Sequence, residues 1–455
     1  MQKRSFWKKI SALALITLSI FSITGCGGNA DTAQSGDKKP VKIVFWYAVG
    51  GKVGDATKEL VDKFNSTHPD IKVEAVFQGD YDSAINKLKQ SIASKSTPNV
   101  MQVYDIGTRF MIDSKAAVPV QKWIDKENFD TSKYEKNILA YYTVDNKLYS
   151  MPFNTSTPIL YYNKDMFKEA GLDPNKPPQT FEEVAADAQR LTKRDDTGKV
   201  TRPGMVLAIY GWFFEQFLAE QNSMYANNNN GRDSMATAAS FNSPQGEKIL
   251  DWWSGMVKDG STVNMGRKTA DTMKAFVSGQ TAMTIDSTGV LGDIMDGVNG
   301  KFEVGTGNMP HPEGAEGGGV IIGGASLWML NGHSDEEEKA SWEFIKFMTA
   351  PEQQAFWHIK TGYFPVTTDA YDNEDLKKYE AKYPQFKVAV EQLHHTPVNR
   401  STQGGLLGVF TQSRQEIESA IEQVLDGKAS SKDALQKAAD TVNEAIGRYN
   451  SSVSQ

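Results

Sequence analysis

The feature that most constrains the fold is an alternation of strand-like and helix-like sequence over residues 41–104. Residues 41–46 form a short run rich in β-branched and aromatic side chains, and apolar residues alternate with polar ones over 71–77. Apolar residues recur at spacings of four, three and four over 81–92, as on one face of an amphipathic helix. A helix is expected between the first two strands, and a third strand is expected at 100–104. The order β-α-β-α-β predicts an α/β layered domain with a largely parallel sheet.

Two polar residues follow directly after predicted strands. Tyr81 comes just after the second strand, and Asp105 comes just after the third. In sheets of this kind, ligands bind beyond the carboxyl ends of the strands. Both residues are therefore placed to contact a ligand.

The rest of the chain predicts a second α/β region. Residues 151–162 form an extended and almost uncharged segment, and Thr180 with Glu183 offers a capping box that begins a long helix. A strand is expected at 281–285, and the C-terminus has the apolar spacing of helices. The 430 residues from 26 to 455 are enough to form two domains.

The N-terminus has the organisation of a bacterial secretory signal. Four basic residues precede residue 10, and residues 10–25 carry no charge. A basic segment, a short apolar segment and small residues before a cleavage site are typical of such signals, and this apolar run is too short for an ordinary transmembrane helix. We predict a lipoprotein signal peptide at 1–25 and a flexible tether at 26–40, where the residues are small and polar.

The cleavage site Ile23-Thr24-Gly25-Cys26 resembles the lipobox of bacterial lipoproteins. The resemblance implies cleavage before Cys26 and a diacylglyceryl thioether on its sulfur. Cys26 is the only cysteine in the chain, as expected for an exported protein that keeps a cysteine for anchoring alone. The expected location is the extracellular face of the cytoplasmic membrane, to which the lipid on Cys26 anchors the protein. A plain signal peptide with an incidental cysteine is the alternative.

Net charge limits the partners. Removal of residues 1–25 takes four positive charges away, so the formal net charge falls from −7 to −11. A nucleic-acid partner is disfavoured, because such proteins carry a basic surface. An anionic ligand would have to be held by local groups against the overall field.

Several kinds of catalytic and cofactor site are absent from the sequence. There is no P-loop, no His-Glu-x-x-His and no Gly-x-Ser-x-Gly, and the adjacent pair His394-His395 is unsuited to one metal ion. We therefore expect no metal, no cofactor and no catalytic residues. Paired carboxylates for glycoside cleavage keep a secreted glycoside hydrolase open as an alternative.

Eight sequence blocks carry a family resemblance. Four of them resemble extracellular solute-binding proteins of the maltose-binding class: Val44–Trp46, Tyr161–Pro174, Pro178–Phe181 and Ala282–Ile285. Four others resemble the glycerol-3-phosphate-binding proteins of Ugp-type ABC importers: Gln102–Gly107, Pro152–Pro158, Gly323–Trp328 and Trp357–Tyr363. The likeness extends from about residue 41 to residue 450.

The resemblance implies an α/β, two-lobed periplasmic-binding-protein fold of type II, in which each lobe is a sheet flanked by helices and a cleft lies between the lobes. Lobe 1 would comprise residues 41–154 and 313–363, and lobe 2 would comprise 155–312 and 364–455. The implied ligand is glycerol-3-phosphate or a glycerophosphodiester. The implied partners are the permease subunits of an ABC importer, and the protein is expected to be a monomer.

The resemblance also assigns eight ligand-binding residues: Tyr81, Asp105, Ser156, Trp212, Ser287, Gly324, Tyr363 and Arg414. A carboxylate at Asp105 can accept bonds from two hydroxyls of a glycerol end, and Arg414 can form a charge-assisted pair with phosphate. Two serines and the amide of Gly324 can donate to phosphate oxygens, while Trp212 offers a cation–π surface for choline. Each residue also has an ordinary structural interpretation, such as packing or capping, when it is taken singly.

Three departures from the family pattern concern the ligand. Ile209 stands where relatives have a second cleft tryptophan, Asp105 replaces a glutamate, and Asp286 stands beside Ser287 where a small neutral residue is usual. A carboxylate next to phosphate repels it unless the carboxylate points away or pairs with a cation. A neutral sugar or oligosaccharide binder therefore stays open, as does a signalling or adhesive lipoprotein.

Overall fold

The computed structural model describes residues 39–453. The predicted signal peptide, the lipidation site Cys26 and the tether up to residue 38 lie outside the described residues. Across 39–453, every helix is too short or too polar to span a bilayer.

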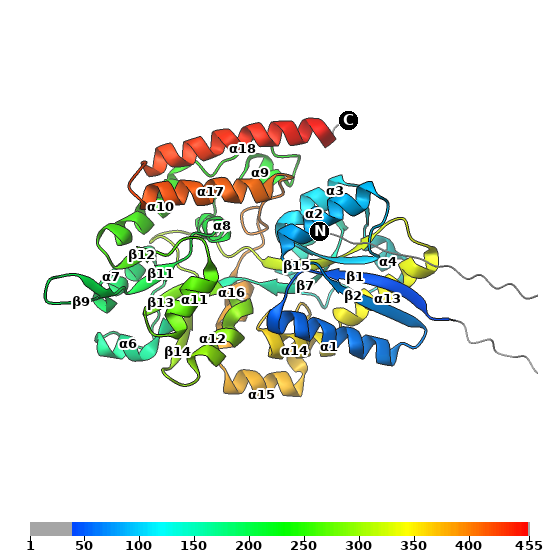
Figure 1. The fold of residues 1–455 in the computed structure, drawn as a ribbon, viewed down its shortest axis with the longest axis horizontal. Helices are drawn as coiled ribbons and strands as arrows, with labels where there is room; N and C mark the ends of the chain where they lie inside the picture. The colour runs from blue at the N-terminus through cyan, green and yellow to red at the C-terminus, as the bar shows by residue number, and fades with distance from the viewer. Residues whose placement is uncertain (1–38, 454–455) are drawn as a thin grey trace, which may run out of the picture. The chain divides into compact units, whose positions relative to one another are not determined.

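The first sheet is built largely from the N-terminal part of the chain (Figure 1). Its strand order is β2-β1-β3-β15-β4, with β7 also paired to β15. The strands are β1 (Val41–Tyr47), β2 (Ile71–Phe77), β3 (Val100–Tyr104), β4 (Ala117–Val118), β7 (Met151–Ser156) and β15 (Gly323–Leu330). The helices α1 (Gly51–Thr67) and α2 (Tyr81–Ala93) connect the first three strands, as the alternating pattern predicts.

The predicted parallel sheet is confirmed for β1, β2 and β3, which pair in parallel. The sheet as a whole is mixed, because β15 pairs antiparallel with both β3 and β7. β15 enters from a distant part of the chain, so the crossover rule that makes β1 to β3 parallel does not govern its direction.

The second sheet has the order β12-β11-β13-β8-β14. Its strands are β8 (Pro158–Asn163), β11 (Met205–Leu207), β12 (Thr262–Asn264), β13 (Met283–Ser287) and β14 (Val304–Gly307). β8 follows β7 after the single residue Thr157, and all residues from 151 to 163 are buried. This segment is the first connection between the two sheets.

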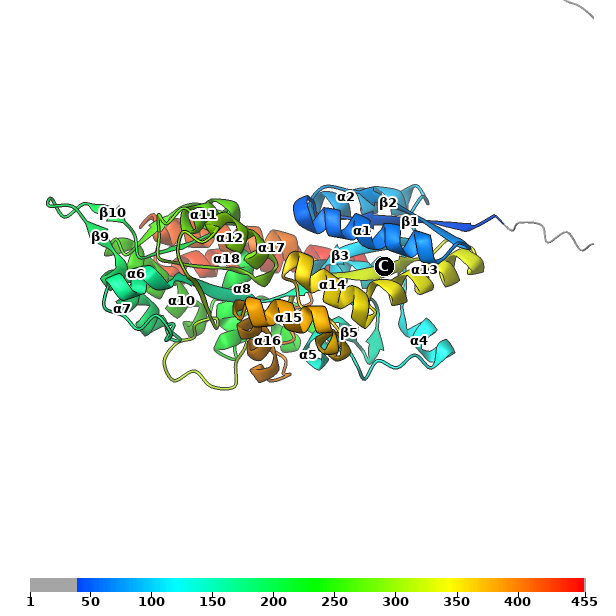
Figure 2. The ribbon, with the colours of Figure 1, turned by 90° about the horizontal axis from the view of Figure 1, so that it is seen from below.

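Helices cover both sheets, and the two groups of elements are also distinct in Figure 2. Among the described residues the helices not yet mentioned are α3 (Thr108–Asp113), α4 (Gln121–Glu127), α5 (Lys136–Tyr142), α6 (Lys164–Glu169), α7 (Phe181–Leu191), α8 (Gly211–Glu220), α9 (Asn227–Gly231), α10 (Pro244–Lys258), α11 (Thr269–Val277), α12 (Leu291–Val298), α13 (Asp335–Met348), α14 (Pro351–Thr361), α15 (Glu374–Lys382), α16 (Gln385–His395), α17 (Phe410–Leu425) and α18 (Ser431–Val453). Short strands β5 (Thr143–Val144), β6 (Lys147–Leu148), β9 (Lys193–Arg194) and β10 (Val200–Arg202) form two hairpins, and 3₁₀ turns occur at η1 (Asp105–Gly107), η2 (Thr288–Val290) and η3 (Thr368–Asp372).

The predicted capping box at the start of α7 is confirmed. The Thr180 side chain accepts a hydrogen bond from the backbone N–H of Glu183 at 3.1 Å, and the Glu183 carboxylate accepts one from the N–H of Thr180 at 3.3 Å. Together these bonds satisfy two of the backbone donors that a helix leaves free at its N-terminus.

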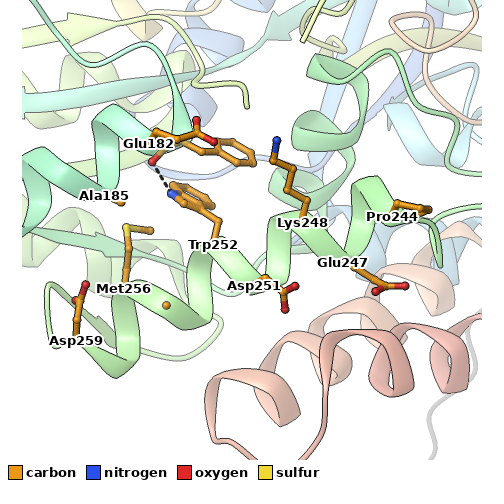
Figure 3. A pocket seen from close by; sticks show the side chains of 11 residues that line it. Glu182, Ala185, Pro244, Glu247, Lys248, Asp251, Trp252, Met256 and Asp259 are labelled. Atoms are coloured by element: carbon orange, nitrogen blue, oxygen red, sulfur yellow. Dashed lines mark hydrogen bonds between the residues drawn. The ribbon is translucent and has the colours of Figure 1, made fainter. Parts of the chain in front are cut away.

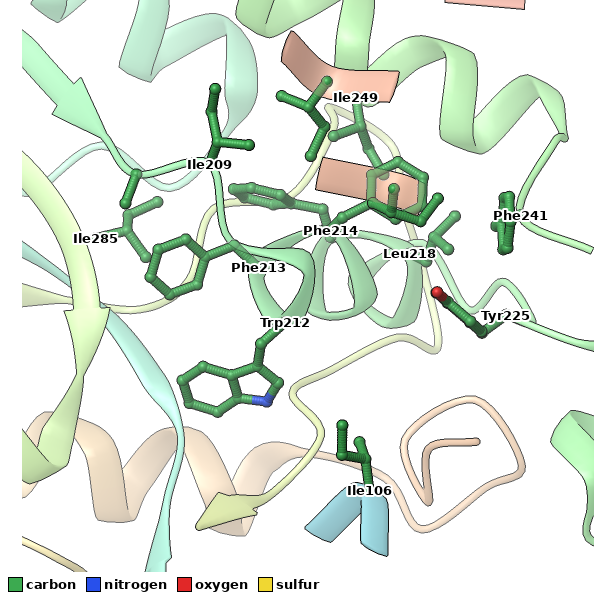
Figure 4. Packing of buried hydrophobic residues seen from close by; sticks show 14 of the residues in the cluster. Ile106, Ile209, Trp212, Phe213, Phe214, Leu218, Tyr225, Phe241, Ile249 and Ile285 are labelled. Carbon is green, nitrogen blue, oxygen red and sulfur yellow. The ribbon is translucent and has the colours of Figure 1, made fainter. Parts of the chain in front are cut away.

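The hydrophobic core of the second sheet includes Ile209, the residue that departs from the family pattern. Figure 4 shows Ile209 among Ile285, Phe213 and Phe214, and its side chain is fully buried. Its backbone N–H donates to the carbonyl of Gly266 at 2.9 Å. At this position the chain therefore contributes packing to the core of the second sheet.

Candidate ligand-binding site

Two of the predicted residues begin new elements at the ends of strands β2 and β3. Tyr81 is the first residue of α2, which Asp80 caps by accepting a hydrogen bond from the N–H of Ser83 at 2.7 Å. Asp105 is the first residue of η1. The ring of Tyr81 stacks on that of Tyr104, with 5.2 Å between centroids. The parallel strands thus deliver both residues to one edge of the first sheet.

Ser156 and Gly324 lie on the neighbouring strands β7 and β15. Ser156 pairs with Gly323, and Thr155 pairs with Gly324. Gly324 has φ +92°, and a Cβ atom there would lie 1.9 Å from the carbonyl oxygen of Asn154, so only glycine fits. Its backbone can therefore approach a ligand without the bulk of a side chain.

Trp212 packs directly on Gly323, the residue before Gly324. A Cβ atom at Gly323 would lie 2.5 Å from Cζ2 of Trp212, so the indole occupies the space that a side chain would need. Trp212 lies in the first turn of α8, and its side chain is 5 % exposed. Helix α8 thus places the indole of Trp212 against β15, the strand that carries Gly324.

Ser287 ends β13 and caps η2, where its Oγ accepts a hydrogen bond from the N–H of Gly289 at 3.1 Å. The N–H of Thr288 donates to the carbonyl of Thr157 at 3.0 Å, which holds this turn beside the β7–β8 connection. The ring of Tyr363 covers the same turn, because a Cβ atom at Gly289 would lie 2.8 Å from its Cζ. Ser287 and Tyr363 are therefore neighbours of Ser156.

Asn154 connects the two groups of residues, although sequence reasoning gave it no contact role. Its Nδ2 donates to the Tyr81 hydroxyl at 2.9 Å, and its Oδ1 accepts from Nε2 of Gln102 at 2.7 Å. Asn154 also interacts with the hydroxyl of Tyr363. The two tyrosine hydroxyls thus lie beside one buried amide.

Arg414 forms a buried ion-pair network. Its Nε and Nη2 donate to the two carboxylate oxygens of Glu215 at 2.6 and 2.9 Å, and Nη2 also donates to Asp105 at 3.2 Å. Arg414, Glu215 and Asp105 are 7 %, 4 % and 6 % exposed. Burial lowers the pKa of the Arg414 guanidinium, but the two carboxylates outweigh this effect and hold the pKa above its usual range. Arg414 thus forms a bidentate pair with Glu215, and its predicted charge-assisted pair with a phosphate stays a prediction.

Glu215 was missed by sequence reasoning. It lies on α8 three residues after Trp212, and residues at that spacing share one face of a helix. Because Trp212 was predicted to contact the ligand, its helix face could also have indicated Glu215 as a residue near the site. Its pairing with a residue 199 positions away has no local signal.

A cavity of about 260 Å³ lies beside this network. The residues that line it are Asp80, Tyr81, Asp82, Tyr104, Ile106, Tyr210, Thr411, Arg414, Gln415 and Glu418. Residues that follow β2 and β3 and residues of α17 therefore line the same cavity.

Three buried polar atoms near the predicted site make no hydrogen bond within residues 39–453. They are Nε1 of Trp212, Oγ1 of Thr155 and Oγ1 of Thr288. Trp212 is itself a predicted contact, Thr155 pairs with Gly324, and Thr288 follows Ser287. A buried donor without a partner costs about 1–3 kcal/mol, so this region is poised to gain from a polar ligand.

Asp286 is buried beside Tyr161 and Tyr363. Burial raises its pKa to about 7, and the N–H of Ser287 donates to its Oδ1 at 2.7 Å. Within the described part of the chain, Asp286 forms no ion pair. The sequence left open whether a cation neutralises this carboxylate. In the structure Asp286 is buried without a cationic partner among the described residues, and burial favours its neutral, protonated form.

A larger cavity, of about 620 Å³, lies between α7 and α10 and contains none of the eight predicted residues (Figure 3). Its floor is Trp252, which stacks on Phe181 at 4.2 Å and donates from Nε1 to the Phe181 carbonyl at 2.8 Å. By size, this cavity would be preferred as the ligand site over the one beside Arg414. The buried network of Arg414, Glu215 and Asp105, however, lies beside the smaller cavity. Over residues 39–453, no group of three or more His, Cys, Asp or Glu side chains is arranged to hold a metal ion.

Comparisons with known proteins place these observations in context. A family model described as bacterial extracellular solute-binding protein matches residues 59–385. The sn-glycerol-3-phosphate-binding periplasmic protein UgpB of Pectobacterium atrosepticum is 36 % identical over 430 residues, which cover 92 % of this chain and 94 % of the relative. The UgpB protein of Yersinia enterocolitica is 37 % identical over 416 residues, with 90 % and 93 % covered.

Solved structures show a corresponding likeness in fold. UgpB from Mycobacterium tuberculosis in complex with glycerophosphocholine has a TM-score of 0.75 at 22 % identity, covering 90 % of this chain and 99 % of that one. The cyclic alpha-maltosyl-1,6-maltose binding protein of Arthrobacter globiformis has a TM-score of 0.72 at 24 % identity, with the same coverage. These likenesses confirm the predicted fold class, a two-lobed α/β fold of sheets flanked by helices.

Proposed function

The chain belongs to the bacterial extracellular solute-binding protein family, and from this premise we propose that it is the substrate-binding component of an ABC importer for sn-glycerol-3-phosphate or glycerophosphodiesters. Membership of the family confirms the predicted resemblance and the prediction of a binding protein in place of an enzyme such as a glycoside hydrolase.

The observation that carries the ligand proposal is the convergence of the eight predicted residues around one region. Ser156, Gly324 and Ser287 supply donors without bulk, and Arg414 supplies the cation. Asp105 lies at the other end of the same ion-pair network, where its second oxygen can accept from glycerol hydroxyls. Relatives 36 % identical over most of the chain are named for sn-glycerol-3-phosphate, which supports this ligand class.

We propose that the ligand is held between two lobes, 41–154 with 313–363 and 155–312 with 364–455. The two separate sheets support this division, since β1 to β4, β7 and β15 form one sheet and β8 with β11 to β14 form the other. With these bounds, the ion pair between Asp105 and Arg414 joins the lobes. A ligand that contacts both lobes favours the closed form by its differential affinity for it.

We also propose that the exported protein is a monomer anchored by a lipid on Cys26, and that its closed form docks on permease subunits. The support for the anchor is the sequence before Cys26 and the absence of any other cysteine. Cys26→Ser tests the anchor: the variant should leave the membrane fraction, whereas retention there would contradict lipidation.

The ligand class is tested by thermal shift of residues 27–455 with sn-glycerol-3-phosphate, glycerophosphocholine and maltotriose. At a ligand concentration 100-fold above Kd, a specific ligand stabilises by about 2.7 kcal/mol. A shift with either phosphate compound and none with maltotriose is the expected result. A shift with maltotriose alone would contradict the phosphate ligand and support the neutral-sugar alternative.

A further inference from the structure

A buried arginine lies outside the predicted ligand site. Arg232 follows α9 and is 7 % exposed, and its guanidinium lies over the ring of Tyr141. All its hydrogen bonds go to backbone carbonyl oxygens: Nε donates to Gly404 at 2.7 Å, Nη1 and Nη2 each donate to Tyr141 at 3.2 Å, and Nη2 also donates to Gln403. These bonds use every N–H of the guanidinium except one on Nη1, which has no partner among the described residues.

No carboxylate balances the positive charge of Arg232. Across residues 39–453 no ion pair includes Arg232, and Asp233, the next residue, pairs with Arg400 at 2.6 Å. Burial, together with the nearby charge of Arg400, lowers the pKa of Arg232 to about 10. Carbonyl oxygens satisfy the N–H donors but carry only partial charges, and buried charges in proteins are normally paired. Arg232 is therefore a buried cation that would gain from an anion beside it.

The backbone before Arg232 explains how this side chain is placed. The three asparagines 228–230 have left-handed φ angles between +53° and +63°. Asparagine is one of the few residues other than glycine that adopt this region readily, which accounts for the run of asparagines. The amide of Asn230 accepts hydrogen bonds from two backbone N–H groups that precede the turn and donates to the carbonyl of Arg400 at 2.9 Å. The turn therefore fixes the positions of Arg232 and Arg400 relative to each other.

Arg232 and Arg400 line the same cavity, which has a volume of about 530 Å³ and contains none of the eight predicted ligand-binding residues. Two nitrogens of Arg400 donate to Asp233 and, at 3.0 Å, to Oε1 of Gln403, while its Nε has no partner in the described part of the chain. Asp145, in the turn between β5 and β6, also lines the cavity but pairs with neither arginine within residues 39–453. The positive end of the cavity is therefore the end formed by the two arginines.

We propose that this cavity is a second ligand site, which binds a small oxyanion of the phosphate type between the guanidiniums of Arg232 and Arg400. The remaining N–H of Arg232 and the Nε of Arg400 supply charge-assisted hydrogen bonds, and the side-chain amide of Asn146 on the same cavity supplies a neutral donor. Guanidinium groups suit this ligand because their planar donors match the oxygens of a phosphate. The site is separate from the one around Ser156 and Arg414 and does not depend on the proposed function.

The test is isothermal titration of residues 27–455 with inorganic phosphate at pH 7.5 and constant ionic strength, with and without saturating glycerophosphocholine. The wild type should bind phosphate under both conditions, because the cavity shares no residue with the predicted ligand site. Arg400→Gln should weaken phosphate binding by about tenfold, since it removes a charge-assisted donor. Asp233→Asn should tighten phosphate binding by about threefold, since it removes a carboxylate that competes for Arg400.

The matched controls are Arg448→Gln and Glu444→Gln, which remove the same charges from one exposed ion pair on α18 and should change no affinity. The side chains of Arg400 and Asp233 are 43 % and 46 % exposed, so both test variants should fold. If Arg400→Gln nevertheless unfolds, the tighter binding expected of Asp233→Asn tests the site by itself.

Phosphate binding that persists beside glycerophosphocholine and changes in opposite directions in the two variants supports the second site. Phosphate that glycerophosphocholine displaces belongs to the predicted ligand site, and this result overturns the inference. Equal affinity in the wild type and Arg400→Gln, or no binding at millimolar phosphate, overturns it as well. A protein that does not bind glycerophosphocholine contradicts the proposed function alone, and the two variants then decide the second site.

Discussion

Asp286→Asn should make the protein more stable at pH 8 and leave its stability at pH 4 nearly unchanged. Asp286 is 4 % exposed, and its one described hydrogen bond comes from the N–H of Ser287. Burial without a cation disfavours the ionised carboxylate, which raises the pKa of Asp286 from 3.8 to about 7. The native state therefore binds a proton at Asp286 that the unfolded chain has already lost above pH 4.

The magnitude follows from linkage. A rise in pKa from 3.8 to about 7 corresponds to about 4 kcal/mol, because one pKa unit is about 1.4 kcal/mol. Between these two pKa values the native state holds more protons than the unfolded state, so the free energy of unfolding falls as pH rises. Above pH 7 both states are ionised at Asp286 and the full penalty remains.

The assay is urea unfolding of wild type and variant from pH 4 to pH 8. The difference in free energy of unfolding should grow from near zero to about 4 kcal/mol in favour of Asp286→Asn, or about 5 °C in Tm at this chain length. Glu220, whose pKa burial raises to about 8, titrates in both proteins, so only the difference reports Asp286. A difference that is constant with pH, or that grows toward pH 4, would refute the reasoning.

Three further predictions concern single side chains. Ser156→Ala should weaken phosphate-ligand binding by about tenfold with no change in unfolding temperature, because the Ser156 hydroxyl makes no hydrogen bond within the described chain; unchanged affinity by titration calorimetry would remove Ser156 from the site. Gly324→Ala should cost more than about 2 kcal/mol in urea unfolding, since φ is +92° and the added Cβ would lie 1.9 Å from the Asn154 carbonyl; wild-type stability would contradict this geometry. Thr180→Ala should cost about 1 kcal/mol by loss of the α7 cap, and any change in ligand Kd would argue against a purely local role.

The sequence predicted most of what depends on neighbours along the chain. The alternation over 41–104 appears as β1, α1, β2, α2 and β3, and the placement of Tyr81 and Asp105 after their strands follows from it. The capping box at Thr180 needs only four consecutive residues and was found for that reason. A strand was expected at the end of the Gly-rich stretch 317–330, but its antiparallel pairing was not predicted, because its direction depends on a chain reversal more than two hundred residues after β3.

The chemistry of the site was harder to predict. The eight site residues came from resemblance, and their convergence depends on both sheets folding. Asp105 and Arg414 are 309 positions apart in the sequence, and Glu215 and Arg414 are 199 positions apart. Neither contact therefore leaves a local sequence pattern. The role of Ile209 in the core likewise depends on which face of the α8 region packs inward, which periodicity alone does not fix.

The most direct test of the central claim is a crystal structure of the protein with glycerophosphocholine. In that complex, phosphate oxygens should lie within hydrogen-bond distance of Ser156, Ser287, the amide of Gly324 and Nη1 of Arg414. A ligand bound in the larger cavity beside Trp252, or a phosphate far from Arg414, would contradict it.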